Sequence, residues 1–170
     1  TDWISYTPTW TKSLGTQPSI GNGTLTGQYR RVGSDMEVII KLTAGSTSTY
    51  GDNIGIYRFS YPSGFTLLSS LSGETIVGQW GGLDSGTNRY SGNVRTSSTY
   101  VETISLAETG TYPTANTELN GTVPWAMATN DVITVVFKVP ITGWSSSVVM
   151  SSDADTRVIS LTAFRDTSPL

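Results

Sequence analysis

The chain has 170 residues and a net charge of −3, from ten basic and thirteen acidic residues. It contains neither histidine nor cysteine, which excludes Ser-His-Asp catalysis, His or thiolate metal ligands and disulfide bonds. The ten basic residues are scattered and offer no footprint for a nucleic-acid backbone. We therefore expect a binding or structural module without a cofactor, not an enzyme.

The surface is expected to be hydroxylated, because charged residues are 14% of the chain while Ser and Thr supply 50 positions. This composition is typical of β-rich proteins with many turns and indicates an extracellular location. No apolar run is long enough to insert into a membrane. The length fits one domain spanning 1–170. Because the chain begins with Thr1, we expect it to be a piece of a longer protein.

Helical periodicity is nearly absent, since Gly, Pro, Asn and runs of Ser and Thr interrupt any apolar stripe. The chain is therefore expected to be all-β. In chain order, strands are predicted at 6–10, 24–31, 37–43, 54–59, 75–79, 90–95, 100–106, 125–128, 131–140 and 157–164, of which 6–10 and 125–128 carry the weakest signals.

Three of these segments have the clearest strand patterns. Residues 37–43 alternate, with Val38, Ile40 and Leu42 on one face and Glu37, Ile39 and Lys41 on the other. Residues 131–140 form a β-branched run that predicts a central strand buried on both faces. Residues 157–164 alternate in the same way as 37–43 and are expected to close the domain.

Turn signals rich in Gly, Asn, Asp and Pro separate nearly all of these strands. Eight to ten short strands predict an antiparallel two-sheet sandwich, because such chains close into sandwiches, jelly rolls or barrels to avoid long free edges. A jelly-roll-like arrangement fits best with a long connection expected over residues 70–90.

Aromatic residues are the main candidates for ligand binding, since Trp and Tyr combine an apolar face with a polar tip. Trp80 opens a glycine-rich stretch and is expected to be exposed. With four tyrosines it is predicted to line a sugar-like ligand surface: Tyr57, Tyr61, Tyr90 and Tyr100. Three other tryptophans are expected in the core or at a subunit interface: Trp10, Trp125 and Trp144.

Four carboxylates lie beside Gly, Asn or Ser at reversals and are expected to serve turns, since a short carboxylate accepts backbone N–H bonds there. These are Asp35, Asp52, Asp84 and Asp131. Asp153 and Asp155 form a weak calcium candidate, with two carboxylates at i and i+2 and flanking hydroxyls. If the chain were a glycan hydrolase, its two carboxylates would be Asp84 with Glu102, or Asp153 with Asp155.

Five strings stand out: YTPTWT at 6–11, PSIGNGTLTGQYRRVG at 18–33, PWAMATND at 124–131, VPITGWSS at 139–146 and DTRV at 155–158. Together they resemble a module of tail-fibre and other virion-surface proteins of tailed bacteriophages. The third string is similar to a family pattern Pro-aromatic-x-x-Ala-Thr-Gly-Asp. Residues 67–118 match poorly, and recognition is expected there.

The resemblance implies a homotrimeric β-sandwich on the virion surface that meets a host-surface glycan or protein, beside other virion proteins. The alternative that it leaves open is a structural one. In that case the domain is a capsid decoration, fibre cap or trimerisation clamp without a ligand. The shared strings contain no residue with an assignable catalytic role.

Overall fold

The computed structural model describes residues 2–71, 73, 75–97, 99–108 and 113–144, and this part of the chain is all-β. One short 3-10 turn, η1 (Ser69–Leu71), interrupts the strands. No described helix is long or apolar enough to cross a membrane. The strands are β1 (Ile4–Tyr6), β2 (Trp10–Lys12), β3 (Thr24–Val32), β4 (Asp35–Thr43), β5 (Tyr57–Ser60), β6 (Ile76–Asp84), β7 (Asn88–Thr96), β8 (Tyr100–Glu108), β9 (Pro113–Glu118) and β10 (Val132–Pro140).

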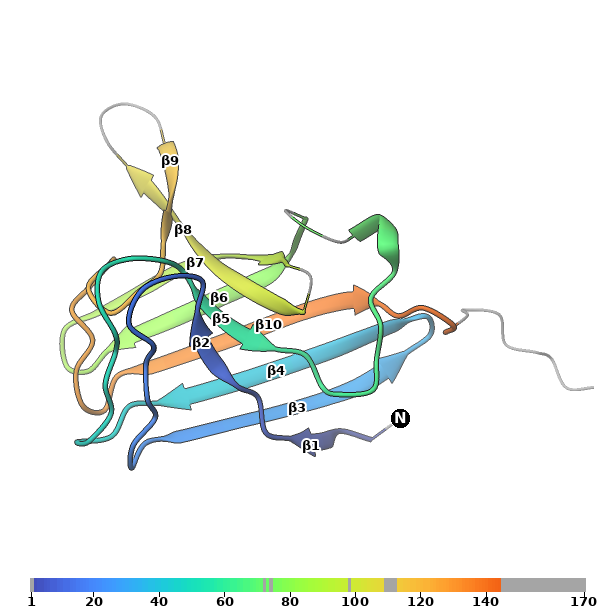
Figure 1. The fold of residues 1–170 in the computed structure, drawn as a ribbon, viewed down its shortest axis with the longest axis horizontal. Helices are drawn as coiled ribbons and strands as arrows, with labels where there is room; N and C mark the ends of the chain where they lie inside the picture. Colours follow the sequence, from blue (N-terminus) through green and yellow to red (C-terminus); the bar gives the residue numbers. More distant parts are fainter. Residues whose placement is uncertain (1, 72, 74, 98, 109–112, 145–170) are drawn as a thin grey trace, which may run out of the picture.

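The strands form one antiparallel sheet in the order β1-β3-β4-β10-β6-β7-β8-β5-β2, with β9 added to β8. The sheet curls into a half-barrel, so that β2 and β5 cross over the face formed by β4 and β10 (Figure 1). Tyr61, directly after β5, packs edge-on against Phe137 of β10 with ring centroids 5.7 Å apart. The predicted antiparallel all-β character is confirmed.

The curl follows from the path of the chain between β1 and β2. These consecutive strands occupy opposite edges of the sheet, yet only residues 7–9 join them. Four residue steps from Tyr6 to Trp10 span at most about 14 Å. A flat sheet of nine strands would be about 38 Å wide at the usual strand spacing. The two edges must therefore approach each other, and a flat sheet is excluded.

Ser60, at the end of β5, holds this crossing in place. Its N–H donates to the Thr9 carbonyl (3.2 Å) and its Oγ accepts from the Thr9 N–H (2.9 Å). The Tyr6 hydroxyl donates to the Ser60 carbonyl at 3.2 Å. One residue thus ties the last residue of β1 and the β1–β2 link to the opposite edge of the sheet.

The core lies inside the curl and is built by alternation along the central strands. Val38, Ile40 and Leu42 of β4 are fully buried, as predicted, while Ile39 between them is exposed. β10 lies between β4 and β6 in the middle of the sheet, which confirms its central position. The prediction that β10 is buried on both faces is wrong, because Val136 is 48% exposed on the outside.

A side chain caps the sheet edge formed by β2. The Gln17 carboxamide accepts a bond from the Lys12 N–H (2.7 Å) and donates one to the Lys12 carbonyl (3.3 Å), as a neighbouring strand would. An unpaired strand edge is a template for pairing with another chain. Gln17 removes this template at Lys12.

Three sequence-based element predictions are wrong. Residues 7–9, the middle of the predicted strand 6–10, are not a strand but the link between β1 and β2. Residues 70–90 do not form a long connection, because β6 and the start of β7 fill most of this stretch and meet in a hairpin whose turn contains Gly86 at φ 85°. Residues 125–128 are not a strand but part of the loop before β10. The predicted strand at 157–164 lies outside the described residues.

Two adjacent glycines of β6 differ in what a side chain would meet. A Cβ on Gly82 would lie 2.4 Å from the Trp125 ring, whereas a Cβ on Gly81 would have nothing within 4 Å. Gly82→Ala should lower the free energy of unfolding by about 1–3 kcal/mol, because it overpacks the core. Gly81→Ala should leave it within about 0.5 kcal/mol of wild type or raise it. Urea unfolding of both variants tests this difference, and equal losses would contradict the packing described.

Candidate functional site

Trp80 and Tyr57 do not stand on a ligand surface. Trp80 is 2% exposed, and its Nε1 donates to the Ile104 carbonyl at 2.9 Å. Tyr57 is fully buried, its ring meets Trp10 edge-on, and its hydroxyl donates to the Tyr50 carbonyl at 2.8 Å. Burial raises the pKa of the Tyr57 phenol. The prediction that Trp80 is exposed is therefore wrong, and both rings belong to the core.

The other three predicted aromatic residues are partly buried, and Tyr90 lies apart from Tyr61 and Tyr100, which are neighbours where β5 pairs with β8. Tyr90 stacks on Trp125 with centroids 4.9 Å apart and an interplanar angle of 5°. Tyr100 lies near the Arg58 guanidinium, and Tyr61 packs on Phe137. Tyr90 lies near the start of β7, whereas Tyr100, the first residue of β8, lies beside the end of β7, about 20 Å away along the strand. The five residues are not brought together into one surface.

The described carboxylates do not form the hydrolase pair considered from the sequence. Asp84 of β6 is paired with Asn88 of β7, and Glu102 of β8 is paired with Arg95 of β7. Asn88 and Arg95 are seven residues apart along β7, so the two carboxylate-bearing residues are separated by about 23 Å along the strand direction. A glycosidase pair needs a separation of about 5–10 Å. Glu102 instead accepts from Arg58 (2.7 Å) and Arg95 (2.8 Å) and is nearly buried. Asp153 and Asp155 lie outside the described residues, among which no group of metal-ligating side chains occurs.

The PWAMATND string at 124–131 has a structural role. Asp131 is buried and accepts from Trp125 Nε1 (2.8 Å), from the Ala128 N–H (2.7 Å) and from the Ser85 N–H (2.8 Å). Asn130 has φ 71° and stands where the resembled pattern has glycine. Asn tolerates this left-handed conformation better than other residues with side chains. The motif thus locks the loop before β10 to the β6–β7 turn.

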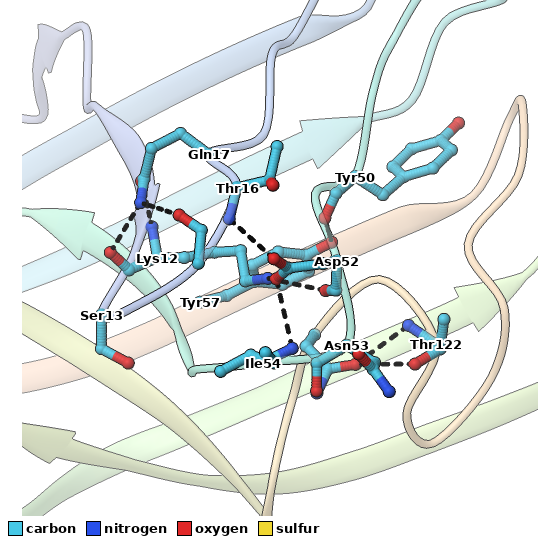
Figure 2. Close-up of polar contacts among 12 residues, drawn as sticks. Lys12, Ser13, Thr16, Gln17, Tyr50, Asp52, Asn53, Ile54, Tyr57 and Thr122 are labelled. Carbon is cyan, nitrogen blue, oxygen red and sulfur yellow. Dashed lines mark hydrogen bonds and ion pairs between the residues drawn. The ribbon is translucent and has the colours of Figure 1, made fainter.

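The polar cluster around Lys12 is also structural (Figure 2). The Lys12 side chain is fully buried and is paired with the Asp52 carboxylate, while its Nζ donates to the Asp52 carbonyl at 2.6 Å. Asp52 also accepts from the N–H groups of Thr16 (2.8 Å) and Ile54 (3.2 Å). The hydrogen bond from Lys12 and that from the Thr16 backbone hold the Asp52 pKa well below its usual range. The cluster joins the loop after β2 to the loop before β5.

The face of the sheet that points away from the core carries several open hollows, and we call it the outer face. It is formed by the residues of β3, β4, β10, β6 and β7 that alternate with core residues. Cross-strand pairing arranges these residues in rows. One row contains Gln28, Ile39, Val136 and Gln79, and the next contains Thr26, Lys41, Thr134, Gly81 and Ser91.

The first hollow, of about 470 Å³, is mainly apolar. Ile39 (37% exposed), Val136 (48%) and Val77 line it, and Trp3 (36%) stands at its side. Arg30 lies over the Trp3 ring at 4.7 Å from the centroid. We call this region the apolar hollow. Exposed apolar side chains gathered on one face are typical of an interaction surface.

The second hollow, of about 370 Å³, lies two residues further along the same strands. Lys41 and Arg89 line it, and no carboxylate does. We call it the cationic hollow. Its remaining lining residues are Gly81, Gly82, Leu83, Tyr90, Val132 and Thr134.

Tyr90, a predicted ligand-surface residue, lines the cationic hollow, but sequence reasoning missed the other residues of both hollows as a site. The alternation in 37–43 correctly placed Ile39 and Lys41 opposite the core face. Trp3, Val136 and Arg89 were not considered, because their positions beside β4 follow only from the pairing of distant strands. The available signal was Val136, an apolar residue at an outward position of a strand.

Comparisons with models of protein families, with curated proteins and with solved structures find no match to this chain. The resemblance to virion-surface modules therefore rests on the sequence strings alone.

The Lys12–Asp52 pair predicts how stability depends on pH. Because the Asp52 pKa is lowered in the folded protein, its stabilising effect is present above the ordinary value of 3.8 and is lost as the pH falls further. Asp52→Asn should therefore reduce the free energy of unfolding at neutral pH, and the difference from wild type should shrink below about pH 4.

Urea unfolding at a series of pH values measures this difference. In a Lys12→Met background, which lacks the main cause of the lowered pKa, the effect of Asp52→Asn should depend less on pH. A difference that stays constant into strong acid would contradict the assigned role of the pair.

Proposed function

We propose that the chain is a non-enzymatic surface domain of a tailed-bacteriophage virion, which attaches to a host-surface glycan through the outer face. The observation that carries this proposal is the outer face itself. The apolar hollow and the cationic hollow lie there on regular strands whose inner side chains are fixed in the core. Binding surfaces on rigid strands position their contacts more firmly than loops do. The motif resemblance supplies the virion context.

The fold that we associate with this function is a jelly-roll-like two-sheet sandwich. Its support is the crossing of β2 and β5 over β4 and β10, which puts a second layer on the core side of the sheet (Figure 1). In such a sandwich the side of a sheet that points away from the core is free to bind a ligand. Here that side is the outer face.

We further propose that the domain is a homotrimer whose subunits meet at the apolar hollow. Trp3, Ile39 and Val136 are too exposed for a monomer core and lie together. Contact with a neighbouring copy would remove them from water. Three copies would also raise the avidity of weak glycan sites.

Attachment is tested with the fluorescently labelled chain and a panel of bacterial strains. We expect binding to cells of at least one strain, and loss of binding after periodate oxidation of the surface polysaccharide. If no strain is labelled, or if periodate leaves labelling unchanged, glycan attachment is wrong.

The trimer is tested by light scattering over a range of protein concentrations. The wild-type mass should be close to three times 18.2 kDa, and Val136→Lys should shift it towards one subunit because it places a charge in the apolar hollow. Ile54→Lys is the matched control, since Ile54 is 56% exposed but lies in the loop before β5. A wild-type monomer, or equal effects of the two variants, would contradict the proposed interface.

A second function is favoured by the same apolar exposure. If the trimer forms but no cell or glycan is bound, the domain is a structural decoration or fibre cap.

A further inference from the structure

The cations of the outer face fall into two groups. Arg30 is neutralised by Glu37 at 2.7 Å and Lys138 by Asp35 at 3.2 Å. Lys41 and Arg89 are both exposed and have no ion-pair partner among the described residues. Both line the cationic hollow. On the described part of the outer face, positive charge without an ion-pair partner thus gathers at the cationic hollow, although the net charge of the chain is negative.

Strand pairing brings these two cations to opposite sides of the hollow. Lys41 on β4 is paired with Thr134 on β10, which is paired with Gly81 on β6. Arg89 on β7 belongs to the next row, beside Leu83. The Cα atoms of Lys41 and Arg89 are three strand spacings and two residues apart, which corresponds to about 16 Å. Two long side chains at this distance can reach one ligand from both sides.

Gly81 leaves the space between them open. Among the glycines in the described strands, a Cβ would meet another atom within about 2.5 Å at Gly27, Gly78, Gly82 and Gly92, but nothing within 4 Å at Gly81. Its backbone does not have a positive φ either. The fold does not require glycine at this position. The absence of a side chain instead deepens the hollow beside the Thr134 hydroxyl.

We propose that the cationic hollow binds the oxyanion of an acidic sugar, a carboxylate or phosphate group carried on a glycan. The Arg89 guanidinium and the Lys41 ammonium supply charged donors for the oxyanion. Thr134 supplies a hydroxyl for the ring, and Leu83 and Val132 supply an apolar wall for its C–H groups. This inference rests on the proposed glycan attachment and specifies its ligand class.

The charge cluster is too small for a nucleic-acid-binding groove, so a short acidic glycan fits the cationic hollow better than a nucleic acid does. Nucleic-acid affinity requires many phosphate contacts along a basic stripe. Here two cations flank a single hollow, and the neighbouring row offers Ile39, Val136 and Gln79 instead of further cations. One or two oxyanions on a short glycan match this arrangement.

The test is calorimetric titration of the whole 170-residue chain at low salt with tetragalacturonic acid. Its methyl ester is the control ligand, because it keeps the sugar and removes the charge. We expect the acid to bind and the ester to bind at least about tenfold more weakly. Glucose 1-phosphate is titrated separately, and the tighter of the two acidic ligands identifies the oxyanion as carboxylate or phosphate.

Three variants locate the site. Lys41→Ala and Arg89→Ala should each weaken binding of the acidic ligand about tenfold, and Gly81→Leu should weaken it by filling the hollow without changing the charge. Lys138→Ala is the matched control, because it removes a cation of the same face outside the hollow. Urea unfolding checks that each variant is folded.

Three results would overturn the proposal: no binding of either acidic ligand, equal binding of acid and ester, or equal effects of Lys138→Ala and Lys41→Ala. The proposed function fails separately. If acidic sugars bind at the cationic hollow but no cell is labelled, the proposed ligand class is supported and host attachment is wrong. If the wild-type chain labels cells through glycans and the Lys41 and Arg89 variants label them as strongly as wild type, host attachment is supported and the proposed role of the cationic hollow is wrong.

Discussion

The short link between β1 and β2 is the constraint on which the rest of the structure depends. A sheet without helices must cover its own apolar face, and here residues 7–9 force the two edges together so that β2 and β5 cover β4 and β10. Ser60 fixes the link by bonding both Thr9 and Tyr6. The inner face is thereby closed, and the apolar side chains of β4 and β10 form the core.

No described part of the chain covers the opposite face of the sheet. Along β4 and β10 the outward residues change from apolar to cationic within two positions, from Ile39 and Val136 to Lys41 and Thr134. One end of the face is therefore suited to another protein surface and the other end to an anion. The proposed trimeric attachment domain would need both kinds of contact, and the two hollows lie on neighbouring rows of one sheet.

Local patterns in the sequence predicted most strands, because alternation and turn residues act over a few positions. Ile39 and Lys41 were placed outside correctly for this reason. Trp80 was misplaced because its burial depends on Gly92, which belongs to the paired strand β7 and leaves room for the indole ring. The site was not predictable as a unit, since Lys41 and Arg89 meet across β10 and β6, and the pairing of these strands links residues far apart in the chain.

The central claim is that the outer face is the ligand-binding surface and that its cationic end selects the ligand. A map of amide chemical-shift changes in the ¹⁵N-labelled chain during titration with tetragalacturonic acid tests this claim most directly. The account predicts that the largest changes cluster at Lys41, Gly81, Arg89 and Thr134, with little change around Lys12 and Asp52. Changes that cluster in those loops, or near Tyr61 and Tyr100, would contradict it.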